Sequence, residues 1–180
     1  MNNFIYENST KVYFGHGCVK EFLSSLTRDS RNILLASGLR SAKKNGIYDE
    51  VLNILMADGK NVVDFSGIMP NPTYQKVLEG IDLVKKNDVD LILGIGGGSV
   101  MDCAKAVSLG ARCSGDPWEN FWGRKGIVDF PPVPVGVIPT TAGTGSECNG
   151  AAVITNEKTK VKIGYDYAKC NPVFALMDPV

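Results

Sequence analysis

The sequence predicts a doubly wound α/β fold built on a mainly parallel sheet. Short apolar runs without polar alternation, such as residues 91–95, suit strands that are covered on both faces, as in parallel sheets. Segments with apolar residues at helical spacing alternate with these runs. Glycine-rich polar turns follow several of the strands. Because ligands of doubly wound sheets bind outside the carboxyl ends of the strands, these turns are the candidate functional sites.

The composition is that of an ordinary globular protein, with 44% hydrophobic and 21% charged residues in a chain of 180, long enough for one domain with a sizeable core. Lys and Arg together number 19, as do Asp and Glu, so no basic field favours nucleic acid or an anionic membrane. The N-terminal residues lack the pattern of a signal peptide, and no apolar run is long enough to span a membrane. We therefore expect a cytoplasmic protein without nucleic-acid or membrane partners.

Cysteine and histidine usage restricts the possible metal chemistry. The cysteines are widely spaced and form no Cys-x-x-Cys pair, so we expect reduced thiols rather than disulfides or a zinc knuckle. His16 is the only histidine in the sequence. A catalytic metal site that needs two or more histidines therefore cannot be completed within this sequence.

The first half of the chain predicts strands at residues 4–8, 11–14, 32–36 and 61–65. Amphipathic helices are expected between them, with Val19, Phe22, Leu23 and Leu26 on one face of the first and Ile47, Val51, Ile54 and Leu55 on one face of the second. After the Pro70-Asn71-Pro72-Thr73 turn, a third helix carries Tyr74, Val77, Leu78, Ile81 and Val84.

The second half begins with the strand at residues 91–95 and a helix from Ser99 to about Leu109. A long polar and proline-containing segment follows at residues 113–134, and such segments are often functional loops or lids. A strand at residues 135–138 then enters a second glycine-rich turn. Residues 151–155 and 160–164 predict a hairpin, and residues 173–177 predict the last strand.

The sequence Gly96-Gly97-Gly98-Ser99 predicts a pyrophosphate site. Glycines permit positive φ and lack the Cβ atoms that would block a ligand. Ser99 can cap a helix whose free N–H groups and positive dipole end attract phosphate. A tight turn with close packing of strand against helix is the alternative. Asp102 lies three residues after Ser99, which suits a capping box and a ligand role equally. The spacing matches neither the Rossmann fingerprint nor a P-loop.

The second glycine-rich turn carries hydroxyl groups beside its glycines, from Thr140, Thr141, Thr144 and Ser146. Hydroxyls next to backbone that a ligand can approach closely suit hydrogen bonding to a ribose or a carboxamide. A loop whose hydroxyls bond only its own backbone is the alternative.

These motifs resemble the iron-containing (group III) alcohol dehydrogenase family. The resemblance rests on Gly-Gly-Gly-Ser-x-x-Asp at residues 96–102 and on Pro-Thr-Thr-Ala-Gly-Thr-Gly-Ser-Glu at residues 139–147. The Pro70-Asn71-Pro72-Thr73 turn, Lys162 and the closing Met177-Asp178-Pro179 also resemble family positions. Lys43-Lys44-x-Gly46 and Asp116-Pro117-Trp118 are similar to the butanol dehydrogenase and aldehyde reductase branch.

The resemblance implies that residues 1–180 form a dinucleotide-binding domain like the N-terminal domain of dehydroquinate synthase. It implies that Gly97, Gly98 and Ser99 hold the pyrophosphate, that Asn71, Thr140, Thr141, Thr144 and Lys162 line the riboses, and that Asp102 lies near the cofactor. We expect Gly96 and Ser146, in the same two turns, to be cofactor-binding residues as well. A helical domain carrying Fe²⁺ or Zn²⁺ on one Asp and three His is expected after residue 180. This chain would then contain no catalytic residue and no metal ligand.

The implied activity is hydride transfer between a nicotinamide cofactor and a primary alcohol or aldehyde, in a family that commonly forms homodimers. We expect the isolated chain to bind cofactor without turnover. The alternatives are a glycerol or glycerol-phosphate dehydrogenase-like enzyme, a dehydroquinate synthase-like enzyme, and a nucleotide-binding module without catalysis.

The coenzyme can be argued from the turn after residues 32–36. An NAD enzyme usually places Asp or Glu near the end of an early strand to bind the ribose 2′-OH, but residues 37–48 contain no acidic residue. Hydroxyls and cations suited to a 2′-phosphate stand there instead, at Ser37, Gly38, Arg40, Ser41, Lys43 and Lys44. We therefore predict NADP(H) over NAD(H). The alternative is that Lys43 and Lys44 are merely solvated at the start of a helix.

Overall fold

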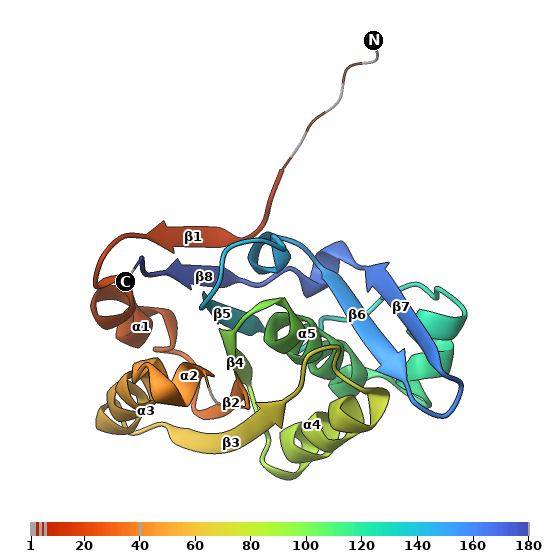
Figure 1. The fold of residues 1–180 in the computed structure, drawn as a ribbon, viewed down its shortest axis with the longest axis horizontal. Helices are drawn as coiled ribbons and strands as arrows, with labels where there is room; N and C mark the ends of the chain where they lie inside the picture. The colour runs from red at the N-terminus through yellow and green to blue at the C-terminus, as the bar shows by residue number, and fades with distance from the viewer. Residues whose placement is uncertain (1–2, 4, 6, 40, 180) are drawn as a thin grey trace.

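The computed structural model of the chain describes residues 3, 5, 7–39 and 41–179. Within these residues the main sheet has six parallel strands in the order β1-β8-β5-β4-β2-β3 (Figure 1). The strands are β1 (Lys11–Phe14), β2 (Asn32–Gly38), β3 (Asn61–Ile68), β4 (Leu91–Gly96), β5 (Val135–Pro139) and β8 (Phe174–Met177). The predicted parallel α/β fold is confirmed.

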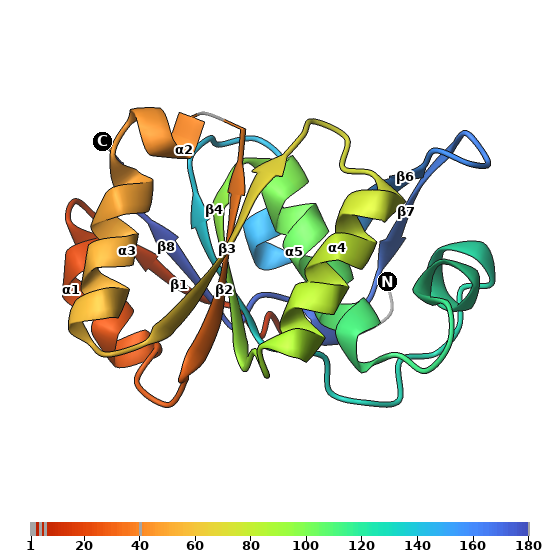
Figure 2. The ribbon, with the colours of Figure 1, turned by 90° about the horizontal axis from the view of Figure 1, so that it is seen from below.

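Helices cover both faces of this sheet (Figure 2). On one face lie α1 (Cys18–Leu26) and α3 (Ile47–Ala57), which follows the short helix α2 (Ser41–Lys44). On the other face lie α4 (Tyr74–Lys86) and α5 (Gly98–Arg112). A separate antiparallel hairpin, β6 (Ala151–Asn156) and β7 (Val161–Asp166), packs on the outer side of α5. The chain is therefore wound on both sides of the sheet.

The apolar run in β2 shows why its sequence has no polar alternation. Ile33 and Leu35 belong to the core beneath α1 and α3, whereas Leu34 and Ala36 belong to the core beneath α4 and α5. All four side chains are fully buried. Burial of a Leu or Ile side chain contributes about 2 kcal/mol, so both faces of the strand stabilise the fold.

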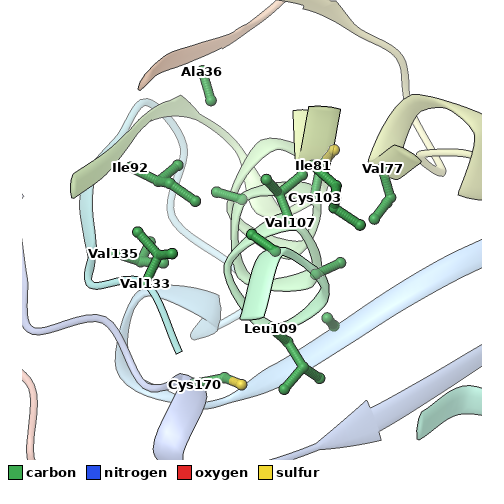
Figure 3. Close-up of a cluster of buried hydrophobic side chains, with 14 of the residues drawn as sticks. Ala36, Val77, Ile81, Ile92, Cys103, Val107, Leu109, Val133, Val135 and Cys170 are labelled. Carbon is green, nitrogen blue, oxygen red and sulfur yellow. The ribbon is translucent and has the colours of Figure 1, made fainter. Parts of the chain in front are cut away.

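The larger core surrounds α5. Figure 3 shows Val107 of α5 between Ile92 of the sheet and the side chains of Ile81 and Val77 on α4. The outer side of the same helix contacts β6. Because α5 is enclosed by the sheet, by α4 and by the hairpin, nearly every residue from Val100 to Ala111 is buried.

The predicted strand at residues 4–8 is wrong over the residues that the structure describes. Ile5, Glu7 and Asn8 belong to no strand, and residues 4 and 6 lie outside the described residues. Within the described chain β1 is the first strand of the sheet and pairs with β8 at its edge. The Asn8 amide instead donates to Cys148 O at 2.8 Å.

The segment predicted as a functional loop or lid has a structural contact with the hairpin. It contains a π-helical turn (Trp118–Gly123) in which Trp118, Phe121 and Trp122 are buried. Trp122 Nε1 donates to Ala152 O of β6 at 3.1 Å. The hairpin itself is confirmed, although its second strand starts one residue later than predicted because Lys160 has φ 57° and belongs to the turn.

Among the residues that the structure describes, no helix combines the length and the apolar character needed to cross a bilayer.

Candidate functional site

Two glycine-rich segments meet at the carboxyl ends of β4 and β5. We call residues 96–99 the glycine turn and residues 139–147 the threonine loop. The two strands are neighbours, with Gly96 in register with Pro139, and Thr140 N–H donates to Gly96 O at 3.1 Å. The chain leaves β2 towards α3 on one face and leaves β4 towards α5 on the other. Since β2 and β4 are adjacent, the topological switch point lies at the carboxyl ends of these two strands, where open α/β sheets bind ligands.

The glycines of the turn have two different roles. A Cβ on Gly96 would lie 2.5 Å from Val100 Cγ2, so this position serves the close packing of strand against helix. A Cβ on Gly97 would lie 3.0 Å from Thr141 Oγ1, and one on Gly98 would lie 2.9 Å from Thr144 Cγ2. Gly97 and Gly98 therefore present bare backbone towards the threonine loop.

The N-terminus of α5 differs from the prediction. Gly97 is the N-cap, in an extended conformation with φ −83° and ψ −171°, and it supplies no side-chain cap. The prediction that Ser99 caps the helix is wrong, because the helix begins at Gly98 and Ser99 lies inside its first turn. The capping box between Ser99 and Asp102 is therefore wrong as well.

This N-terminus can accept an anion. The backbone N–H groups of Gly98 and Ser99 have no hydrogen-bond acceptor within the described part of the chain. The first turn also carries no acidic side chain. Unpaired N–H groups at the positive end of a helix dipole form a ready site for a phosphate group.

Asn71 and Lys162, which are distant in sequence, lie together beside this helix end. The backbone N–H of Asn71 donates to Ser99 Oγ at 3.3 Å, and Lys162 Nζ donates to Asn71 Oδ1. Asn71 has φ 55°, a left-handed conformation that Asn tolerates better than most residues. Both side chains are exposed, and the structure thus connects a cation to the first turn of α5 through Asn71.

The predicted site residues of the threonine loop divide into exposed and internal groups. Thr141 and Thr144 are exposed and Thr140 is half-buried. Ser146 is buried, and its hydroxyl donates to Asp102 Oδ1 at 2.6 Å. The other carboxylate oxygen of Asp102 accepts from Val153 N–H at 3.1 Å. Asp102 and Ser146 therefore connect α5 to the loop and to β6.

The alternative of a self-bonded loop holds in part. Thr144 Oγ1 accepts from Ser146 N–H at 3.3 Å, and Asn149 Nδ2 donates to Gly145 O at 2.8 Å. Gly145 has φ 66°, a left-handed conformation that favours glycine over other residues. The loop is thus shaped by its own bonds while two of its hydroxyls stay exposed.

Lys105 is a residue that the sequence reasoning missed. It lies on α5, it is fully buried, and burial lowers its pKa to about 8 although Asp102 opposes this shift. Its ammonium donates to Ser146 O at 2.9 Å, to Ser146 Oγ at 2.7 Å, and to O and Oδ1 of Asn149 at 3.0 and 3.2 Å. The sequence feature that could have identified it is a lysine with apolar residues on both sides of it in the middle of the predicted helix.

The turn after β2 lies partly outside the described residues. Gly38 ends β2, where a Cβ would lie 3.7 Å from Val100 Cγ2 of α5. Arg40 lies outside the described residues, and Ser41 begins α2. Lys43 Nζ lies 4.0 Å from Asp64 Oδ1 and 4.6 Å from the centre of the Tyr48 ring.

Asp64 is an acidic group near this turn although it lies outside residues 37–48, on β3. Tyr48 and Ser66 donate to its carboxylate at 2.5 and 2.7 Å. Burial opposes its ionisation, but these two hydrogen bonds, together with the charges of Lys43 and Lys76, outweigh burial and lower the pKa of the Asp64 carboxyl. An anionic side chain therefore lies beside Lys43.

A cavity of about 420 Å³ lies at the other end of the sheet, near the start of β5 and β8. Proline and other apolar residues form much of its wall, together with Asp129 and Lys169. Ligands of open parallel sheets bind at the carboxyl ends of the strands, and this cavity lies at the amino ends. We therefore assign the candidate site to the glycine turn and the threonine loop.

A doubly wound parallel sheet with an uncapped helix N-terminus at its switch point defines the class of open α/β domains that hold anionic ligands at that edge. The sequence identifies the branch of that class. The chain belongs to the iron-containing alcohol dehydrogenase family, whose model matches residues 9–179.

Relatives with known names support this assignment. The chain is 40% identical over 179 residues to the probable NADH-dependent butanol dehydrogenase 2 of Bacillus subtilis, covering 99% of this chain and 45% of that protein. It is 37% identical to the NADPH-dependent aldehyde reductase YqhD of Escherichia coli, covering 100% of this chain and 46% of that protein. The crystal structure of NADH-dependent butanol dehydrogenase A from Thermotoga maritima superposes with a TM-score of 0.91 at 41% identity, covering 99% of this chain and 44% of that one. The chain thus spans somewhat less than half the length of these relatives.

The family description implies iron. Across residues 3, 5, 7–39 and 41–179, no group of three or more His, Cys, Asp and Glu side chains is placed to hold a metal ion. The described residues therefore do not fit an iron centre.

Proposed function

We propose that this chain binds a nicotinamide adenine dinucleotide at the switch point and forms the dinucleotide-binding domain, residues 1–180, of an alcohol dehydrogenase or aldehyde reductase. One observation carries the proposal: the unpaired N–H groups of Gly98 and Ser99 lie at an uncapped helix end. The bare backbone of Gly97 and Gly98 beside that end faces the threonine loop. A pyrophosphate is an anion that such a helix end suits.

Each group around the helix end has a proposed role. The N–H groups of α5 hold the pyrophosphate, and the ammonium of Lys162 adds a positive charge beside it. The hydroxyls of Thr140, Thr141 and Thr144 and the amide of Asn71 bind the riboses. When bound, the reduced nicotinamide would donate a hydride to an aldehyde, and the oxidised form would accept one from a primary alcohol. The chain contributes binding and orientation to that step.

The comparisons agree with this substrate class, since the named relatives include butanol dehydrogenases and an aldehyde reductase. In this proposal the described residues supply the cofactor site without a metal centre. We therefore expect the purified chain to bind the dinucleotide and to reduce no aldehyde.

NADP(H) is proposed as the preferred coenzyme. The absence of acidic residues from residues 37–48, together with Lys43 and Lys44, supports binding of a 2′-phosphate. Asp64 beside Lys43 weakens the positive field at one of these cations. Relatives named as NADH-dependent and as NADPH-dependent both occur, so a direct comparison of the two coenzymes is needed.

Isothermal titration of the purified chain with NADPH and NADH tests both the cofactor role and the preference for NADP(H). We expect binding of both, with NADPH about tenfold tighter, and a loss of that difference in Lys44→Met. Lys85→Met, an exposed lysine in the last turn of α4, is the matched control and should leave the difference unchanged. No binding of either dinucleotide would refute the cofactor role, and equal binding would refute the NADP(H) preference. Reduction of butyraldehyde by the chain, with Fe²⁺ or Zn²⁺ added, would refute the expectation of binding without turnover.

A further inference from the structure

The buried ammonium of Lys105 is completely engaged by the end of the threonine loop, at Ser146, and by Asn149 just after it. An ammonium has three protons, and the four oxygens around this one belong to Ser146 and Asn149, at 2.7 to 3.2 Å. Both partner residues are more than 40 positions away in sequence. The side chain has no exposed surface, so its contacts are made within the protein.

A charge at this position is costly for the fold. Removing an ammonium from water carries a large penalty, which hydrogen bonds and a nearby anion must offset. The nearest anion is Asp102, one helical turn earlier, with Oδ1 at 3.8 Å from Lys105 Nζ. Asp102 in turn accepts from Ser146 Oγ and from Val153 N–H. A methionine would fill similar space on α5 without this cost, so the charge calls for a role beyond packing.

The geometry around the threonine loop suggests that role. Where the loop begins, Thr140 N–H is bonded to Gly96 O. Where it ends, Ser146 is bonded to both Lys105 and Asp102. Thr141 and Thr144 lie between these two attachments, directly over the bare backbone of Gly97 and Gly98.

We propose that Lys105 is a positioning residue of the dinucleotide site: its ammonium fixes the end of the threonine loop, and thereby the distance between the hydroxyls of that loop and the N–H groups of α5. This inference rests on the proposed function, because the positioned groups are those that would bind the pyrophosphate and ribose. Lys105 itself touches no ligand in this arrangement.

The charge state of Lys105 provides a readout that packing alone would not give. Burial lowers its pKa, while three carboxylates from different elements favour the ammonium: Asp102 of α5, Asp166 of β7 and Glu147 in the 3₁₀ turn Ser146–Cys148. The Cys170 thiol in the turn Ala168–Cys170 also faces it, and burial raises the pKa of that thiol to about 12. Above about pH 8 the amine loses a proton donor and its charge, and its hold on four acceptors weakens.

The test is the dissociation constant of NADPH for the purified chain, measured from about pH 7 to about pH 9.5, a range that brackets the ionisation of Lys105. We expect the wild-type dissociation constant to rise about tenfold across this range, because the loss of one charge-assisted hydrogen bond weakens binding by about that factor. Lys105→Met should bind about tenfold more weakly than wild type at pH 7 and show no such rise. Lys105→Arg, which stays charged, should show no rise either. Lys85→Met is the matched control and should follow the wild-type curve.

The wild-type curve requires no variant, so it remains decisive if Lys105→Met does not fold. A wild-type dissociation constant that is constant over this range would overturn the positioning role, as would tight binding by folded Lys105→Met. Absence of NADPH and NADH binding by the wild-type chain at every pH would instead overturn the proposed function, and this inference with it.

Discussion

The backbone N–H of Asn71 donates a hydrogen bond to Ser99 Oγ at 3.3 Å, so the turn between β3 and α4 is fixed to the first turn of α5. Lys162 of β7 extends this contact by donating to Asn71 Oδ1. Three separate segments therefore converge at the uncapped helix end, and the exposed ammonium of Lys162 is the positive group among them.

Replacement of Lys162 by methionine is expected to weaken binding of NADPH and NADH to a similar extent. The variant removes one charge-assisted contact next to the proposed pyrophosphate and leaves the buried core unchanged, so an effect of about tenfold is expected. Isothermal titration measures it. Lys169→Met is the matched control, because Lys169 is exposed beside the cavity at the amino ends of the strands. Equal losses in both variants would contradict a specific role for Lys162.

Substitution of Gly98 by alanine tests the close approach of the two glycine-rich segments. The new Cβ would lie 2.9 Å from Thr144 Cγ2, so the threonine loop must move outward. Alanine is itself a good helix former at this position, and the melting temperature should change little. We expect the dissociation constant of NADPH to rise about tenfold or more.

Gly94→Ala on β4 is the control for that substitution. Its Cβ would meet Ala104 Cβ at 3.6 Å, an ordinary van der Waals contact, and it lies below the loop rather than facing it. Binding by this variant should match wild type. If Gly98→Ala also binds like wild type, the threonine loop does not contribute to the site.

The sequence predicted the strands and helices of the main fold because their patterns are local. Residues 91–95 carry the apolar run of a strand buried on both faces, and the structure forms β4 there. Strand order and pairing are not local. The contact between β1 and β8 joins opposite ends of the chain, and no spacing within either segment specifies it.

The candidate site was predictable in its motifs and not in its internal contacts. Gly97, Gly98 and Thr144 could be recognised from residue type, because glycine backbone and hydroxyls beside a strand end suit a ligand. The partners of Lys105 lie 41 and 44 residues away, and their distance depends on how the hairpin packs on α5. The helix start could not be fixed either, since Gly97 supplies the N-cap without the side-chain bond expected from Ser99.

Substitution of Gly80 by alanine is expected to destabilise the fold, in contrast to its effect in an isolated helix. Alanine normally gains up to about 1 kcal/mol over glycine inside a helix. Here its Cβ would lie 2.5 Å from Val107 Cγ2 and 2.9 Å from Phe65 Cζ, where α4 packs on α5 and β3. We expect a net loss of about 1–3 kcal/mol in the free energy of unfolding, measured by urea denaturation.

Gln75→Ala, at an exposed position of the same helix, is the control for Gly80→Ala and should change the free energy of unfolding by less than about 0.5 kcal/mol. A more stable Gly80→Ala variant would show that the two helices can separate without cost.

Lys105 should make the stability of the chain depend on pH in the direction opposite to ligand binding. Its pKa is lowered from 10.5 to about 8 in the folded protein. Between these values the unfolded chain binds the proton and the folded chain does not, so the free energy of unfolding rises with pH. Below about pH 8 both states are protonated and the penalty of the buried charge is fully present. The gain in the free energy of unfolding is at most about 3 kcal/mol, reached near the unfolded pKa.

Urea denaturation of wild type and Lys105→Met at about pH 7 and about pH 10 measures this gain, and the difference between the two proteins removes the titration of all other groups. Identical pH dependence in the two proteins would show that the pKa of Lys105 is not lowered by folding.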